Sequence, residues 1–96
     1  MDGLTITSID HGDHGEYRAH SRDSDHIGRL TWVRQGDVRT AEHTLVPEQI
    51  GGRGIGASLV EALIADARDR GFRIVPECSF VRAKFEQHPE WADLRA

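Results

Sequence analysis

The sequence predicts a mixed α+β fold, in which a mostly antiparallel sheet is followed by a strand–helix–strand–helix half. Two runs rich in β-branched residues, 26–34 and 38–46, are separated by a short glycine-containing turn, which is typical of a β-hairpin. An apolar stripe with the 3.6-residue period of a helix runs through residues 55–67. Shorter strand-like segments precede and follow these two features. Together they favour an antiparallel sheet with one long helix packed on it.

The first half of the chain is expected to form short strands joined by polar turns. Within the hairpin, Leu30 and Trp32 fall on one face of their strand, and Thr31 and Val33 fall on the other. Pro47 ends the last of these strands because it has no N–H to donate to a ladder. The expected strands are 4–9, 16–21, 26–34 and 38–46, with turns at 11–15, 22–25 and 35–37.

The second half begins with the long helix, which Gly71 is placed to cap at its C-terminal end. A short buried strand, 72–76, follows and is stopped by a proline; if it is parallel to strand 38–46, the crossover should be right-handed. A second helix is expected over 79–88 with Ser79 as its N-cap. The tail, 88–94, should fold back onto the core through Trp91. The aromatic residues expected in the core are Trp32, Phe80, Phe85 and Trp91.

Composition and charge narrow the classes of function. The 96 residues are expected to form a single domain, 1–96. A net charge of −4 argues against nucleic acid or an anionic membrane as the main partner. A single cysteine, Cys78, excludes an internal disulfide and suits a reducing compartment. With no apolar run long enough to span a bilayer and no signal-peptide pattern, a cytoplasmic location is expected.

The cluster of glycines at the head of the long helix suggests an anion site. The first turn of a helix leaves about four backbone N–H groups without partners, at the positive end of the helix dipole. Gly52, Gly54 and Gly56 would let a phosphate approach these amides, and Arg53 would add positive charge. The pattern is neither a P-loop nor a dinucleotide-binding fingerprint. The alternative is a tight strand–helix turn with no ligand.

Four motifs in order resemble a known family. They are "EHTLVP" before the glycines, "GRGIG" itself, and "VPECSFV" and "HPEW" after the helix. The first two are similar to the acyl-CoA signature of the GNAT superfamily of N-acetyltransferases, and all four resemble a branch of minimal GNAT-like enzymes. The resemblance covers roughly residues 27–94. It implies the GNAT acyl-CoA N-acyltransferase fold and transfer of an acetyl group from acetyl-CoA to an amine that the sequence does not identify.

The resemblance also implies where acetyl-CoA binds. Backbone amides at the helix start would hold its pyrophosphate, and the end of strand 38–46 would hydrogen-bond its pantetheine arm like an added strand. That strand and strand 72–76 would splay apart to form a slot for the thioester. The residues expected to bind the cofactor are Leu45, Val46, Arg53, Gly54, Ile55, Gly56 and Ala57.

Two residues are candidates for catalysis. His43 is the first, because a histidine near the slot could accept the amine proton at neutral pH. Glu42 is expected on the opposite face of the same strand, so at most one of the two would reach the slot. Cys78 could take the acetyl group or contact the thioester, because a thiolate near a helix N-terminus is stabilised. The alternatives are a strand histidine that only bonds a neighbour and a small buried cysteine.

The sequence departs from the family pattern at three points, and the last two leave a second function open. Gly51 stands where the signature has Gln or Arg, and Phe80 stands where the branch often has a tyrosine that could protonate the departing thiolate. The chain is also too short for the helices that shape the acceptor site in larger relatives, which makes a homodimer plausible. A non-catalytic CoA-binding or interaction module is therefore the alternative. His11 and His14 have metal-like spacing, but a polar turn is favoured and no metal is expected.

Overall fold

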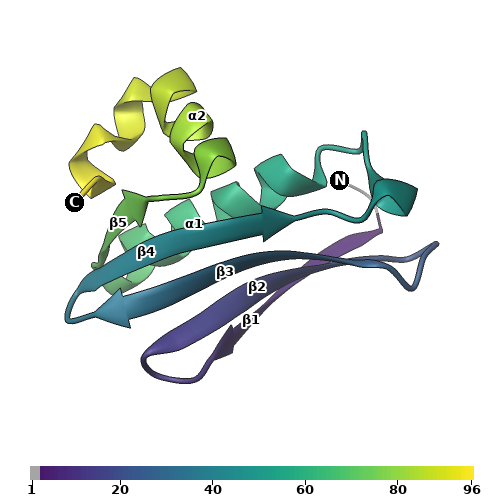
Figure 1. Ribbon diagram of the computed structural model, residues 1–96, viewed down its shortest axis with the longest axis horizontal. Coiled ribbons are helices and arrows are strands. Elements are labelled where there is room, and N and C mark those ends of the chain that lie inside the picture. Colours follow the sequence, from purple (N-terminus) through teal and green to yellow (C-terminus); the bar gives the residue numbers. More distant parts are fainter. Residues whose placement is uncertain (1–2) are drawn as a thin grey trace.

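Residues 3–96 are described by the computed structural model, in which five strands form one sheet in the order β1-β2-β3-β4-β5 (Figure 1). The strands are β1 (Leu4–Asp10), β2 (His14–Ser21), β3 (Ile27–Gln35), β4 (Val38–Leu45) and β5 (Arg73–Pro76). The helices are α1 (Ile55–Arg70) and α2 (Ser79–Gln87), with 3₁₀ turns η1 (Glu48–Ile50) and η2 (Pro89–Leu94).

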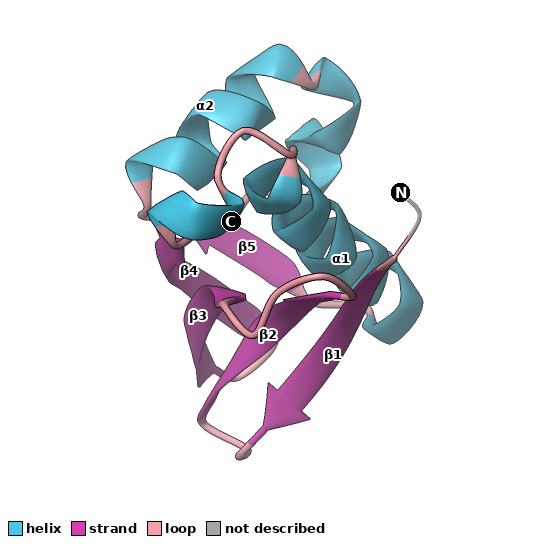
Figure 2. Cartoon of the chain, turned by 90° about the vertical axis from the view of Figure 1, so that its right-hand side faces the viewer, coloured by secondary structure: helices cyan, strands magenta, loops and turns pink. Residues whose placement is uncertain are grey.

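The sheet is antiparallel from β1 to β4 and parallel between β4 and β5, with α1 as the crossover. This arrangement confirms the predicted α+β class and its strand–helix–strand–helix second half. Both helices lie on the same side of the sheet, and within residues 3–96 the opposite face of the sheet carries no helix (Figure 2). The parallel pair of β4 and β5 is where the sequence predicts a slot.

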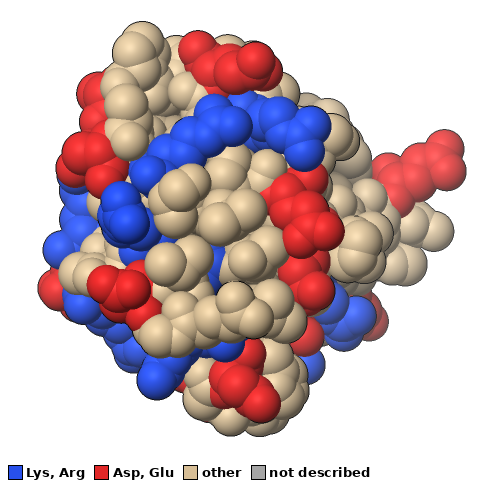
Figure 3. Space-filling view, turned by 60° about the vertical axis from the view of Figure 1, so that its left-hand side comes forward, with Lys and Arg blue, Asp and Glu red and all other residues tan. Residues whose placement is uncertain are grey.

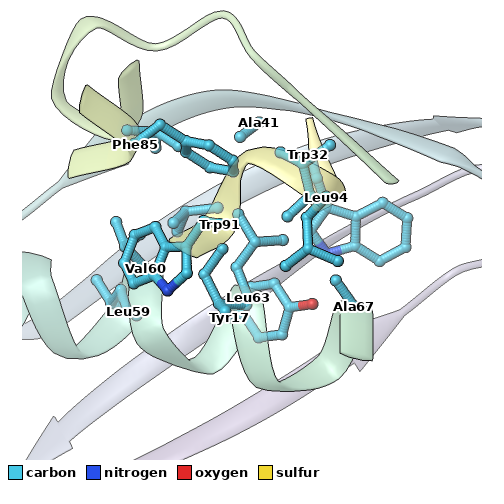
Figure 4. Close-up of a cluster of buried hydrophobic side chains, with 14 of the residues drawn as sticks. Tyr17, Trp32, Ala41, Leu59, Val60, Leu63, Ala67, Phe85, Trp91 and Leu94 are labelled. Atoms are coloured by element: carbon cyan, nitrogen blue, oxygen red, sulfur yellow. The ribbon is translucent and has the colours of Figure 1, made fainter. Parts of the chain in front are cut away.

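The core lies between α1 and the inner face of the sheet. The predicted apolar stripe of α1 is confirmed, because Leu59, Val60 and Leu63 are fully buried. They pack in one cluster with Leu30 and Trp32, the pair predicted to share a face of β3. Figure 4 shows Trp32 beside the helix residues of this cluster. Each such side chain contributes roughly 1.5–3 kcal/mol when it is removed from water. Gly71 caps α1 in a left-handed conformation, as predicted, and its N–H donates to the Ala67 carbonyl.

The C-terminal segment folds back as predicted, but two details of α2 differ from the sequence prediction. Trp91 is buried and meets Phe85 edge to face at 5.6 Å between ring centroids. The residue that caps α2 is Cys78 rather than Ser79, because Ser79 is itself the first residue of the helix. Phe80 is 38% exposed and lies outside the core, contrary to the prediction, because the buried residues of α2 are Val81 and Phe85, and Phe80 lies about 100° around the helix from Val81.

One charged side chain is buried at the end of the sheet where β4 begins. Arg39 is only 3% exposed, and its guanidinium lies between the rings of Trp32 and Phe72, at 3.9 and 4.1 Å from their centroids. It donates hydrogen bonds of 3.2 Å to the Tyr17 hydroxyl and to the Asp66 carboxylate. Tyr17 in turn donates to Asp66 at 2.6 Å. This cluster ties β2, β4 and α1 together.

Tyr17 is expected to titrate well above the ordinary tyrosine value of about 10. Burial raises the pKa of the Tyr17 phenol, and its hydrogen bond to the Asp66 carboxylate raises it further. Because the folded pKa exceeds the unfolded one, the resulting stability is complete below about pH 10 and is lost as the pH rises toward the folded pKa. Tyr17 is the single tyrosine, so phenolate absorbance reports it directly. A native protein that titrates at the same pH as the urea-unfolded chain would contradict this expectation.

Charges of both signs are distributed over the surface. On the face drawn in Figure 3, Lys and Arg side chains lie around an uncharged area, with Asp and Glu side chains interspersed. Within residues 3–96, no helix is both long and apolar enough to cross a membrane.

Candidate functional site

The parallel strands β4 and β5 separate partway along their length. They pair from Val38 with Arg73 to Ala41 with Pro76. The last link is a hydrogen bond of 2.9 Å from the Cys78 N–H to the Ala41 carbonyl. Beyond it β4 continues to Leu45, and this part of its edge has no strand partner within the described residues. The result is a fork that opens toward the start of α1.

A β-bulge in β4 decides which side chains face the fork. Thr31 of β3 is opposite His43, but its neighbour Trp32 is opposite Ala41, so Glu42 is an extra residue in the strand. Thr44 pairs with the buried Leu30, which assigns Thr44 to the helix side of the sheet. By the same register, His43 lies with Thr31 on the face that carries no helix.

The expectation that Glu42 and His43 take opposite faces is therefore wrong. It assumed strict alternation, and the bulge interrupts alternation at that position. Glu42 lines a cavity of about 350 Å³ together with Glu16 and Thr31, so it opens on the same helix-free face as His43. The two polar side chains are thus neighbours on one face.

Cys78 lies at the apex of the fork, at the N-terminus of α2. Its sulfur is 3.6 Å from the Thr44 hydroxyl oxygen. Burial raises the pKa of the Cys78 thiol. The thiolate is favoured by the amides of Val81 and Phe80 and by the Thr44 hydroxyl, and together they outweigh burial. The pKa of Cys78 therefore lies below the ordinary value. The amides act electrostatically, because the sulfur forms no capping hydrogen bond of normal geometry. Thr44 was not predicted as a site residue.

The Thr44 hydroxyl is expected to support the reactivity of Cys78. Replacing Thr44 with valine removes one of the groups that favour the thiolate, so the pH midpoint of Cys78 alkylation by iodoacetamide should move upward. Cys78 is the single cysteine, so the alkylation rate measures it alone. Thr40→Val on the same strand is the matched control, because Thr40 pairs with Val33 and Val75 on the other face. An unchanged midpoint in Thr44→Val would contradict the assignment.

The glycine turn leads from η1 into α1 with its backbone amides open. Gly52 and Gly54 have φ values of +74° and +75°, a left-handed conformation that glycine adopts without strain. The first helical hydrogen bond runs from the Ser58 N–H to the Gly54 carbonyl at 3.1 Å, and no side chain caps the helix. The N–H groups of Ile55 and the two residues after it therefore have no partner within residues 3–96.

These amides border a cavity of about 320 Å³ that reaches from the end of β4 to α2. Phe80 and Lys84, two residues of α2, line its far side; sequence reasoning assigned Phe80 to the core and gave Lys84 no role. Gly56 permits this arrangement, because a Cβ at that position would lie 2.9 Å from the Phe80 ring. The lining consists of Val46, Gly51, Gly52, Gly54, Ile55, Gly56, Ala57, Phe80 and Lys84.

Comparison with known proteins agrees with this geometry. The family model described as GCN5-related N-acetyl-transferase matches residues 16–94, which include the bulged strand, the fork and the glycine turn. The chain belongs to the GCN5-related N-acetyltransferase (GNAT) family. The resemblance predicted from the four motifs is thereby confirmed at the level of the family.

The GNAT fold is also found in a solved structure of low sequence similarity. It is the crystal structure of a GNAT family acetyltransferase from Elizabethkingia anophelis with acetyl-CoA bound. The two chains share 13% identity at a TM-score of 0.66, over 95% of this chain and 76% of the other. No curated protein sequence matches this chain.

Two of the predicted cofactor residues have different surroundings in this GNAT chain. The Arg53 guanidinium turns away from the 320 Å³ cavity and bonds to the Asp23 carboxylate at 2.8 Å and the Ser21 hydroxyl at 3.3 Å. Leu45 is 60% exposed and pairs with Arg29 on the helix-free face, whereas Val46 lines the cavity. Sequence reasoning could not find Asp23 because it lies 30 residues from Arg53 in the chain.

The histidines of the first turn bond within that turn. The rings of His11 and His14 stack at 4.8 Å, and His14 Nδ1 lies 2.7 Å from an oxygen of the Asp13 carboxylate. In the part of the chain from Gly3 onward, no three metal-ligating side chains converge.

Proposed function

We propose that this GNAT chain binds acetyl-CoA and transfers the acetyl group to an amine. The observation that carries the proposal is the row of open amides at the head of α1, which border the cavity of about 320 Å³. The cavity begins at Val46, the residue that follows the unpaired end of β4. A diphosphate suits such a helix N-terminus. The relative from Elizabethkingia anophelis, which has the same fold, is described with acetyl-CoA bound.

The cavity and the fork would hold different parts of the ligand. The diphosphate would accept hydrogen bonds from the amides of Ile55, Gly56 and Ala57, with the Lys84 ammonium nearby as a counter-charge. The pantetheine arm would run along the unpaired edge of β4, which offers backbone groups as another strand would. The thioester would then reach the apex of the fork.

The reaction requires a proton acceptor on the amine side. The amine nitrogen attacks the carbonyl carbon, the C–S bond breaks, and the sulfur leaves as a thiolate that takes up a proton. His43 is the proposed acceptor of the amine proton, and its helix-free face is the side from which an acceptor molecule can approach. Cys78, with its lowered pKa, is proposed to contact the thioester or take the acetyl group transiently.

A CoA-binding module without catalysis is the second candidate. Two observations favour it. In the described part of the chain, the sheet face beside His43 has no helix to complete an acceptor pocket, and Phe80 supplies no hydroxyl to protonate the leaving thiolate. Such a module would keep the open amides and the cavity but turn over no thioester.

Calorimetry and thiol release together test these alternatives. Calorimetric titration with CoA should give a one-to-one complex. Release of free CoA from acetyl-CoA, followed with a thiol reagent over a panel of amines and peptides, should exceed the spontaneous rate and fall at least about tenfold in His43→Gln. Binding without turnover would favour the module, and absence of binding to CoA would remove both candidates.

A further inference from the structure

The outer edge of β1 offers a row of backbone groups that have no partner among residues 3–96. In the β1–β2 hairpin the His11 N–H bonds to the His14 carbonyl, and the Arg22 N–H bonds to the Gly3 carbonyl. Since hydrogen-bonded pairs alternate along an antiparallel ladder, the odd-numbered residues of β1 bond to β2. The N–H and C=O groups of the even-numbered residues therefore point away from β2, in the plane of the sheet, toward its open edge. These residues are Leu4, Ile6, Ser8 and Asp10.

This edge lacks the features that usually block strand pairing. The segment from Leu4 to Ile9 contains no proline, no charged residue and no bulge in its register. The other edge of the sheet is protected, because β5 has only four residues and ends in Pro76. The C-terminal segment also pairs with it, through a hydrogen bond of 2.8 Å from the Ala96 N–H to the Ile74 carbonyl.

The geometry points to β1 as the interface at which two copies of this chain pair antiparallel, joining their sheets across a two-fold axis. The axis would pass beside Thr7, so that Ile6 of each copy pairs with Ser8 of the other and Leu4 pairs with Asp10. This register uses all four outward-facing residues of each strand. The interface is isologous, so two copies saturate it. Further copies cannot add to the other edge of the sheet, because the C-terminal segment pairs with β5.

Charge and apolar area support a second copy as the occupant. Arg22 lies beside Gly3, just before β1, and Asp10 lies at the end of β1, where its carboxylate also pairs with Arg70 of the same chain at 3.1 Å. Antiparallel pairing therefore brings Arg22 of each copy toward the acidic end of the other copy's β1. The Arg22 guanidinium has no ion-pair partner among residues 3–96. Leu4 and Ile6 pack against the core yet keep part of their surface exposed, and pairing would cover that surface.

Pairing through β1 leaves the proposed cofactor site accessible. β1 lies at one edge of the sheet, and the fork between β4 and β5 lies at the other (Figure 1). The interface is therefore independent of the proposed acetyl transfer.

Amide hydrogen exchange tests the interface without any mutation. In the wild-type chain, the amides of Ile6 and Ser8 should exchange freely at low protein concentration and become protected as the concentration rises into the millimolar range. The amides of Thr7 and Ile9, which bond to β2, should be protected at every concentration and serve as the internal control. Ile6 and Ser8 amides that exchange at the same rate throughout, or a chain that sediments as a monomer over that range, would overturn the proposal.

A proline at Ser8 provides the matched variant. Ser8→Pro removes an outward N–H and places a ring on the edge, while the β1–β2 ladder keeps its hydrogen bonds. Sedimentation equilibrium should give Ser8→Pro a dimer dissociation constant at least about tenfold higher than that of Ser8→Thr, which retains the N–H. If Ser8→Pro folds and dimerises as tightly as Ser8→Thr, β1 is not the interface.

Discussion

Replacing Asp66 with asparagine is expected to lower the free energy of unfolding by about 3–5 kcal/mol. The Asp66 carboxylate accepts hydrogen bonds from Arg39 and Tyr17, and the Arg39 side chain is almost completely buried between two aromatic rings. Without that carboxylate, the acidic group left near the guanidinium is Asp10, at the longer distance of 3.5 Å. Urea unfolding followed by Trp fluorescence would measure the change.

Two further variants distinguish the effect of an unpaired buried charge on stability from the effect of a general loss of contacts. Asp93→Asn removes the carboxylate of the exposed Arg68–Asp93 pair and should leave the urea midpoint almost unchanged. Arg39→Met combined with Asp66→Asn removes both buried charges, so the double variant should be more stable than Asp66→Asn alone. A double variant that is less stable than Asp66→Asn would show that the aromatic contacts of Arg39 outweigh the charge.

The elements with local signals were predicted well. The stripe of α1 and its glycine cap are set by residues within one helix, and the hairpin of β3 and β4 is set by one turn; the structure confirms each. The buried role of Arg39 was not predictable in this way, because its partners Tyr17 and Asp66 lie 22 and 27 residues away in the sequence. Only the assembled fold brings them together.

The site was predictable where backbone geometry defines it and not where a single inserted residue does. Glycines with positive φ leave a recognisable pattern before a helix, so the open amides were expected from sequence. The bulge at Glu42 has no such signature, because the polar residues around it fit either face of a strand. Because of the bulge, His43 lies on the helix-free face and Thr44 lies next to Cys78. Strict alternation along β4 would have placed each of these two side chains on the other face.

A glutamate in place of Ala57 is expected to weaken CoA binding at least about 100-fold, because a carboxylate about 4 Å from a phosphate costs roughly 4 kcal/mol at an effective dielectric constant near 20. Ala57 lines the cavity in the first turn of α1, where the amides are open. The same glutamate interacts favourably with the helix dipole, so the melting temperature should stay constant or rise. Stability and binding would then change in opposite directions, which general damage to the fold cannot produce.

Ala57→Gln is the matched control, since it has nearly the same size as glutamate but no charge. It should lose much less affinity than Ala57→Glu, and the difference between the two should shrink as salt is added, because salt screens the repulsion. Equal losses in both variants would mean that bulk alone blocks the cavity. Full CoA affinity in Ala57→Glu would place the diphosphate elsewhere and remove the observation on which the proposed acetyl transfer depends.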